Sequence, residues 1–254
     1  MSFKKKYTIT NKYLTSGTKR RSGIKMPQVS FIVAHDTGND GSTALQNIAY
    51  YENSNNDMNA SAHLFVDDTG IYECIPLLTG TPEKAWHVLY EKPLDNQRFG
   101  DDANDVAAGV ELCYSCNRGN IHNEEAYNRY VWLLSYICYK FGLDPTKIVG
   151  HHILDPERKT DPQNALLKTG KSYYQLLQDV VKEYYECLSK EEDILKLMDW
   201  EIHLAHQAIE NLSKKGLIKE PVDWKRKVSE NPQEILDDIP WMFFVMLDRL
   251  SEKD

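Results

Sequence analysis

Short apolar segments alternate with segments of helical spacing along residues 29–188 of this 254-residue chain. In the first of them Val29, Phe31 and Val33 fall on one face, at the two-residue period of a β-strand. Residues 124–141 instead carry large apolar side chains at helical spacing, and Gly142 follows as a helix stop signal. This alternation predicts an α/β domain with a central mixed β-sheet flanked by helices. The other expected strands span residues 63–66, 71–75, 106–114 and 147–152.

From about residue 172 the strand pattern stops and helical spacing takes over. The expected helices span residues 173–188, 191–212 and 234–250. The second of them carries an apolar stripe made of Trp200, Leu204, Ala205, Ala208, Ile209 and Leu212. We therefore expect three parts: a basic N-terminal arm at residues 1–28, the α/β domain at residues 29–188, and a small C-terminal all-helical module at residues 191–254.

Charge is distributed unevenly and excludes several classes of protein. The net charge of −8 combines +8 in residues 1–28, −10 in residues 29–185 and −6 in residues 186–254, which argues against a chain-wide nucleic-acid footprint. No run of 18 apolar residues is present, so we expect no membrane insertion. The N-terminus is positive but lacks an apolar stretch, and the five cysteines are scattered, so we expect no signal peptide and no disulfide framework. These features predict synthesis and folding in the cytoplasm.

Candidate metal ligands gather in residues 150–162, where His151 and His152 leave an expected strand and Asp161 stands directly before a proline. Imidazole and carboxylate are both normal zinc ligands, and a catalytic zinc needs only three protein ligands. His35 ends another strand and meets a loop rich in Gly, Asp and Asn, where function usually lies in α/β folds. Taken alone, His35 is better explained as an ordinary core or hydrogen-bonded histidine.

Glu111 places one carboxylate inside the otherwise apolar segment 106–114. An isolated buried charge is unfavourable, so this side chain is paired, lies near a metal, or has a raised pKa. The alternative is an edge strand with Glu111 facing water. Two other patterns carry less weight: Cys113 and Cys116 have C-x-x-C spacing without a second pair, and His203 and His206 share a helix face without a third ligand.

Five motifs occur in a fixed order along the chain. They are Phe31-Ile32-Val33-Ala34-His35, Ser61-Ala62-His63-Leu64, Ala85-Trp86-His87, Gly109-Val110-Glu111, and the Gly150-His151-His152 to Arg158-Lys159-Thr160-Asp161-Pro162 run. This order resembles the zinc-dependent type-2 N-acetylmuramoyl-L-alanine amidases. That family includes phage endolysins, bacterial autolysins and cytoplasmic muropeptide amidases, with peptidoglycan recognition proteins as relatives. The resemblance covers residues 30–167.

The resemblance implies one zinc ion bound by His35, His151 and Asp161, in the family branch that uses Asp as third ligand. His152 is the alternative to His151, because alternation along a strand points the two side chains to opposite faces. The resemblance also implies Glu111 as the general base and Lys159 as the donor to the developing oxyanion.

The resemblance further implies that His63, Trp86 and His87 line the substrate groove. Some family members have a tyrosine directly before the histidine that matches His63, where it assists catalysis. Ala62 occupies that position here, so a tyrosine-assisted mechanism is not expected.

The function implied is hydrolysis of the amide bond between N-acetylmuramic acid and L-alanine of peptidoglycan. We expect a phage or prophage endolysin or a bacterial autolysin, which reaches the wall through a holin-type membrane pore. The alternatives are a cytoplasmic muropeptide-recycling amidase and a non-catalytic peptidoglycan-recognition module. The C-terminal module or the basic arm is expected to contact a wall polymer. The alternative is that the module mediates dimer contacts, so that the protein forms a homo-oligomer.

Overall fold

The computed structural model describes residues 2–90, 93–189, 197, 199–230 and 235 of the chain. Contacts divide these residues into two compact units. The larger unit is Phe3–Leu188, and the smaller comprises the described residues from Ser189 onward together with Ser2. Among the described helices, none has both the length and the apolar character that crossing a membrane requires.

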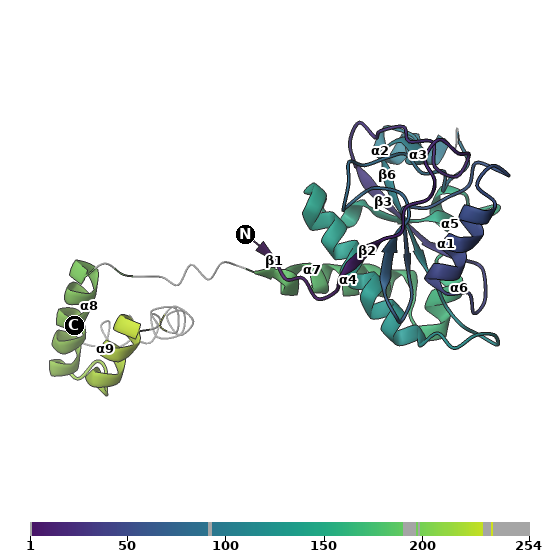
Figure 1. The fold of residues 1–254 in the computed structure, drawn as a ribbon. Helices are drawn as coiled ribbons and strands as arrows, with labels where there is room; N and C mark the ends of the chain where they lie inside the picture. Colours follow the sequence, from purple (N-terminus) through teal and green to yellow (C-terminus); the bar gives the residue numbers. More distant parts are fainter. Residues whose placement is uncertain (1, 91–92, 190–196, 198, 231–234, 236–254) are drawn as a thin grey trace. The chain divides into compact units, whose positions relative to one another are not determined.

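A six-stranded mixed sheet forms the centre of the larger unit (Figure 1). All neighbouring strands run parallel except the antiparallel pair β4 and β5. The predicted mixed sheet flanked by helices is therefore confirmed. In spatial order the strands are β2 (Ile9–Asn11), β5 (Ile71–Glu73), β4 (Leu64–Val66), β6 (Ala107–Leu112), β3 (Phe31–Asp36) and β7 (Ile148–Gly150).

Strand β3 explains how the core is arranged on both faces of the sheet. Its six residues are all buried, as expected for a central strand of a parallel sheet. Ile32 and Ala34 belong to one apolar cluster, whereas Phe31 and Val33 belong to a second cluster. Since side chains alternate along a strand, the two clusters lie on opposite faces of the sheet.

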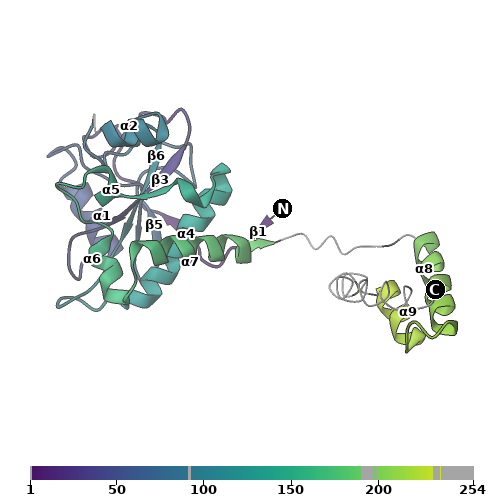
Figure 2. The same ribbon diagram turned by 180° about the vertical axis from the view of Figure 1, so that it is seen from behind.

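Helices cover both faces, as Figures 1 and 2 show. The larger cluster receives side chains from α1, α4, α6 and α7, and the smaller one from α3 and α5. Gly142 ends α4 in the left-handed conformation, at φ 64°, as the stop signal predicted. The helices are α1 (Ala44–Asn53), α2 (Pro93–Phe99), α3 (Ala103–Val106), α4 (Asn123–Phe141), α5 (His151–Leu154), α6 (Gln163–Leu166) and α7 (Tyr173–Cys187), with 3₁₀ turns η1 (Pro145–Lys147) and η2 (Leu167–Thr169).

The expected strand at residues 147–152 is shorter than predicted. Strand β7 ends at Gly150, and α5 begins at His151. The two adjacent histidines therefore lie on the first turn of a helix, and strand alternation does not decide where they point.

The basic segment at residues 1–28 is not a separate arm, because residues from Phe3 onward belong to the larger unit. Strand β2 extends the sheet by pairing parallel with β5. Leu14 and Arg20 are buried, and Arg21 forms an ion pair with Glu83. Several of the positive charges are thus neutralised or buried within the fold, which removes most of the basis for a free polymer-binding arm. Two short strands, β1 (Ser2–Phe3) and β8 (Leu188–Ser189), form a separate two-stranded sheet.

In the smaller unit the structure describes two helices, α8 (Asp199–Lys214) and α9 (Pro221–Glu230). An apolar groove between them has a volume of about 200 Å³. Helix α8 corresponds to the second expected helix, whereas α9 was not expected. The predicted helix at residues 234–250 lies outside the described residues except for Ile235.

Candidate metal centre

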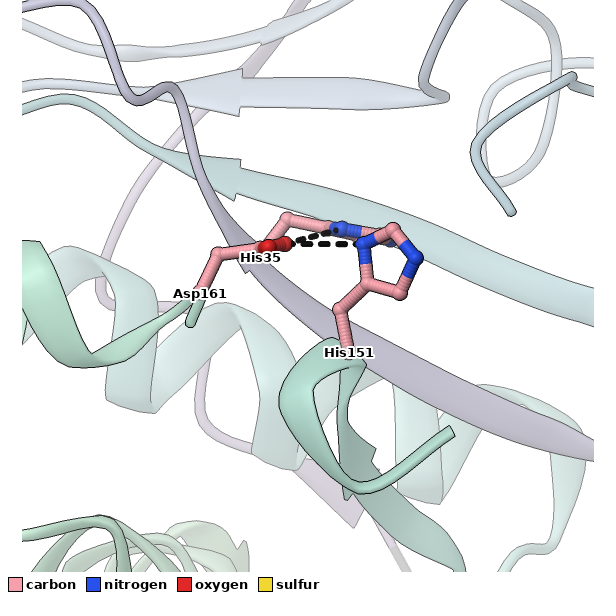
Figure 3. Close-up of side chains that lie close together, drawn as sticks. All are labelled: His35, His151 and Asp161. Atoms are coloured by element: carbon pink, nitrogen blue, oxygen red, sulfur yellow. Dashed lines mark hydrogen bonds and ion pairs between the residues drawn. The ribbon is translucent and has the colours of Figure 1, made fainter. Parts of the chain in front are cut away.

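Three side chains converge at the carboxyl ends of strands β3 and β7. His35 lies near the end of β3, His151 begins α5, and Asp161 lies in the loop before α6. Asp161 Oδ2 is 2.8 Å from His35 Nδ1 and 3.0 Å from His151 Nδ1 (Figure 3). Among the residues that the structure describes, these form the one group of three or more such side chains close enough to hold a metal ion.

His152 points away from this cluster. Its backbone N–H and its ring Nδ1 lie 3.0 and 3.2 Å from the carbonyl oxygen of Asp161, and its ring packs edge-on against Tyr173. Gly150 makes room for the ring, because a Cβ there would lie 2.6 Å from His152 Nδ1. His152 therefore holds the loop that carries Asp161. Of the two adjacent histidines, it is His151 whose ring lies in the cluster.

The charge states of the cluster suit a divalent cation. Burial lowers the pKa of His35 to about 4, so its ring is neutral at neutral pH. Burial alone would raise the pKa of Asp161, but the contacts with His151 and His35 outweigh it and hold that pKa well below its usual range. A neutral imidazole, a second imidazole and a carboxylate form the donor set of a zinc site with an open position.

A cavity of about 370 Å³ opens over the cluster. Among the described residues, three buried side-chain atoms have no hydrogen-bond partner: Trp86 Nε1, Glu111 Oε2 and His151 Nε2. All three residues line this cavity. Since buried polar atoms are nearly always paired, three unpaired ones around one cavity point to a polar ligand there.

The sequence profile of the N-acetylmuramoyl-L-alanine amidase family (Amidase_2) matches residues 25–164. The chain belongs to the type-2 amidase family. The matched segment contains all three residues of the cluster, with Asp161 near its end. The family resemblance predicted from the motif order is confirmed.

Two Bacillus proteins illustrate the relationship. The chain is 31% identical over 151 residues to the N-acetylmuramoyl-L-alanine amidase BlyA of Bacillus subtilis (strain 168), an alignment covering 56% of this chain and 39% of BlyA. It is 30% identical over 146 residues to a probable N-acetylmuramoyl-L-alanine amidase of Bacillus licheniformis, an alignment covering 57% of this chain and 40% of that protein. The alignments therefore span about two fifths of the length of these relatives.

Solved structures share the fold of the amidase-family domain. The catalytic domain of XlyA superposes with a TM-score of 0.53 at 23% identity, covering 68% of this chain and 99% of that domain. The Staphylococcus aureus hydrolase AmiA, in complex with its ligand, gives a TM-score of 0.54 at 24% identity, covering 71% of this chain and 85% of AmiA.

Glu111 of the amidase-family domain lies beside the cluster, because β6 pairs with β3 in a register that places it opposite His35. Burial raises the pKa of Glu111 well above its usual range, and the nearby carboxylates of Asp161 and Asp36 raise it further. Lys159 acts in the opposite direction and lines the same cavity. A carboxyl group with a raised pKa beside a candidate metal site suits general acid–base chemistry.

The predicted role of His63 in lining the groove does not agree with the structure. Its ring is fully buried, and it is not among the residues that line the cavity. Gly109 N–H donates to His63 Nδ1 over 2.9 Å, and His63 Nε2 lies 2.8 Å from the carbonyl oxygen of Glu83. His63 therefore joins backbone segments inside the amidase-family fold, while Trp86 and His87 do line the cavity as expected.

Several cavity residues of the amidase-family domain were not singled out from the sequence. Asp36 accepts hydrogen bonds from Asn164 Nδ2 and Ala165 N–H, both over 3.2 Å, and so ties the end of β3 to α6. Its position directly after His35 in a Gly- and Asp-rich loop is the signal that would have found it. The other additional lining residues are Thr37, Gly38, Tyr51, Ala60, Ser61, Arg158, Thr160 and Asn164.

The C-x-x-C pair does not form a site. Cys113 is buried and contacts Asn47, whereas Cys116 is exposed. On α8, His206 Nε2 lies 3.1 Å from the carbonyl oxygen of Lys225 and His203 contacts Gln207, so these two histidines make separate contacts.

Proposed function

We propose that this chain is a zinc-dependent N-acetylmuramoyl-L-alanine amidase that hydrolyses the bond between N-acetylmuramic acid and L-alanine of peptidoglycan. The observation that carries the proposal is the convergence of His35, His151 and Asp161 in one cavity with Glu111, whose Oε2 is unpaired. Family membership and the names of the Bacillus relatives support the substrate.

The residues present fit one zinc ion, which His35, His151 and Asp161 would hold. The Nδ1 atoms of His35 and His151, which face Asp161 Oδ2 at 2.8 and 3.0 Å, and the neutral ring of His35 agree with this assignment. When bound, zinc supplies Lewis acidity that polarises the scissile carbonyl and makes water more acidic.

Glu111 takes a proton from the attacking water while the water oxygen bonds to the carbonyl carbon. As the carbon–nitrogen bond breaks, Glu111 returns that proton to the departing amine of L-alanine. Lys159 donates a hydrogen bond to the carbonyl oxygen as negative charge develops on it. The unpaired indole N–H of Trp86 is available to a polar group of the substrate.

The proposed context is wall degradation by a phage or prophage endolysin or a bacterial autolysin, with release from the cytoplasm through a holin-type pore. One structure of the same fold is described as a mutant endolysin from Bacillus subtilis, at 22% identity and a TM-score of 0.54. A cytoplasmic muropeptide-recycling amidase is the alternative context. A non-catalytic recognition module is disfavoured because the candidate ligands His35, His151 and Asp161 line one cavity together with Glu111.

Digestion of purified cell walls tests the function. We expect new L-alanine amino termini without new reducing sugar ends, loss of this activity on chelation, recovery with zinc, and one zinc per chain by elemental analysis. New reducing ends, or activity that survives complete metal removal, would overturn the proposal.

We propose that the smaller unit binds the wall, with homo-oligomer contact as the alternative role. The apolar groove between α8 and α9 supports an interaction function. A chain ending at Leu188 keeps the whole larger unit, so it should cleave soluble muropeptides at the full rate but pellet poorly with walls. Undiminished pelleting would remove the wall-binding role, and sedimentation of both chains would reveal an oligomer.

A further inference from the structure

His87 makes a contact with the metal cluster that differs from a substrate contact. It lies in the segment between β5 and α2, and its Nδ1 is 3.0 Å from Nε2 of His35. The two rings are nearly perpendicular, at 88°. On its other side, His87 Nε2 is 3.2 Å from the carbonyl oxygen of Ala107. A continuous line of contacts therefore runs from Ala107 through His87 and His35 to Asp161.

The donor and the acceptor of each hydrogen bond in this line follow from the backbone carbonyl of Ala107 at its end. The carbonyl oxygen of Ala107 can only accept, so His87 carries its proton on Nε2. With that proton on Nε2, His87 presents the lone pair of Nδ1 to His35 and accepts from His35 Nε2–H. The Nε2–H group of His35 is thereby engaged, and its Nδ1 faces Asp161 Oδ2 at 2.8 Å. A metal ion held by Asp161 would therefore meet His35 at Nδ1.

The fold holds His87 in place by contacts that do not involve the cavity. The side chain of Asn104 accepts from the backbone N–H of His87 over 2.8 Å and from that of Val88 over 3.0 Å. The ring lies against Gly109 so closely that a Cβ on Gly109 would be 2.6 Å from His87 Cγ. Strand β6 thus provides the acceptor at Ala107 and, two residues later, the space for the ring.

We propose that His87 is a positioning residue that fixes the tautomer of His35, so that Nδ1 of His35 is presented to the metal. The inference rests on the proposed zinc site, and it adds a second role to the place of His87 in the cavity lining. Partners that orient a metal-ligating histidine through its second nitrogen usually contribute about 10–100-fold to metal affinity. A backbone carbonyl acting through a second histidine would serve here in place of a carboxylate.

The first test reads the tautomers directly. Long-range ¹H–¹⁵N correlation spectra of the histidine rings, recorded on the metal-free full-length protein at pH 7.5, should show Nε2–H for both His87 and His35. A bare Nε2 on His35, or a proton on Nδ1 of His87, would overturn the proposal. This measurement needs neither zinc nor activity, and it does not depend on a variant that folds.

The second test measures zinc affinity by competition with a chelating dye. His87→Phe keeps a buried ring but removes both nitrogens, and we expect it to weaken zinc binding about 10–100-fold. His63→Phe makes the same change at a buried histidine that contacts backbone, and it should leave zinc affinity nearly unchanged. In the spectra of the folded His87→Phe protein, His35 should lose its single tautomer.

The outcomes separate the two proposals. If the wild-type chain binds no zinc, the proposed function fails, while the tautomer pattern remains measurable. If wild type and His87→Phe bind zinc equally well, the positioning role alone is wrong.

Discussion

Two buried polar clusters of the larger unit differ in how their polar atoms are satisfied. In the metal pocket, formed by His35, His151, Asp161 and Glu111, two side chains retain a buried atom without a partner. In the N-terminal network, formed by Arg20, Arg21, His63 and Glu83, no such atom occurs among the described residues.

Arg20 and Arg21 show how complete the pairing in the N-terminal network is. The guanidinium of Arg20 donates to the carbonyl oxygens of Ser54 and Ala60 and to Ser54 Oγ. Arg21 binds both carboxylate oxygens of Glu83, at 2.8 and 3.1 Å. The network joins the N-terminal segment to the loops beside the sheet and leaves nothing for a ligand.

The difference distinguishes a candidate binding site from a polar network that only stabilises the fold. Leaving a buried polar atom unpaired costs about 1–3 kcal/mol, which a fold tolerates where a ligand later pairs that atom. Changes in the metal pocket should therefore impair binding or chemistry with little loss of stability, whereas changes in the N-terminal network should lower stability.

The largest effect is expected from His151→Ala, which removes one of three proposed metal ligands. Zinc affinity should fall by more than about 100-fold, because outer partners of metal ligands alone contribute 10–100-fold. Zinc content and wall lysis should be lost together, as elemental analysis and turbidity assays would show. His152→Ala is the matched control, and it should still bind one zinc. Loss of zinc only in the His152 variant would reverse the assignment drawn from the structure.

Glu111→Gln should separate chemistry from metal binding. The amide keeps the shape of the side chain but cannot carry the proton, so turnover should fall about 10²–10⁴-fold while zinc stays bound. The melting temperature of the metal-free protein should not fall, since the carboxyl whose Oε2 is buried without a partner has been replaced by a neutral amide. A variant with near wild-type turnover would end the general-base assignment.

Arg20→Ala tests whether the N-terminal network stabilises the fold. Arg20 is 1% exposed, and its loss removes the donor to the carbonyl oxygen of Ala60 and one of the two donors to that of Ser54, which keeps the backbone N–H of Asp57. We expect the free energy of unfolding to fall by about 3 kcal/mol, measured in urea, with the zinc affinity of the folded protein retained. Lys19→Ala, one residue away and exposed, should stay within about 0.5 kcal/mol of wild type. An equally small effect at Arg20 would mean that the network does not support the fold.

The same contrast explains what the sequence could predict. His35, Glu111, His151 and Asp161 follow from ordered motifs at strand ends, where the topology of an α/β sheet gathers functional groups. Their meeting depends on the parallel register of β3 with β6, and the strand pattern already implies neighbouring parallel strands.

The N-terminal network could not be predicted, because its contacts join residues far apart in the chain. Arg20 meets Ser54 and Ala60 across 34 and 40 positions, and no local pattern distinguishes such an arginine from one on a solvated arm. The different roles of His63 and His87, which the sequence had treated alike, have a similar cause. Both are histidines in apolar surroundings, and their roles depend on which backbone atoms each ring meets.

The smallest expected effect is a change in pH dependence at His63. Burial lowers the pKa of His63 to about 4, whereas an unfolded histidine titrates near 6.5. Below pH 6.5 the unfolded chain binds a proton that the native ring does not take up until about pH 4, so stability falls as the pH drops through this window. At pH 5 the contribution of this one group is about 2 kcal/mol relative to pH 7. In the metal-free protein, His63→Gln should therefore be destabilised at pH 7 but lose less stability than wild type between pH 7 and pH 5. Urea unfolding at each pH measures this loss. If both proteins lost the same free energy of unfolding between pH 7 and pH 5, His63 would be protonated, or accessible to water, in the native state.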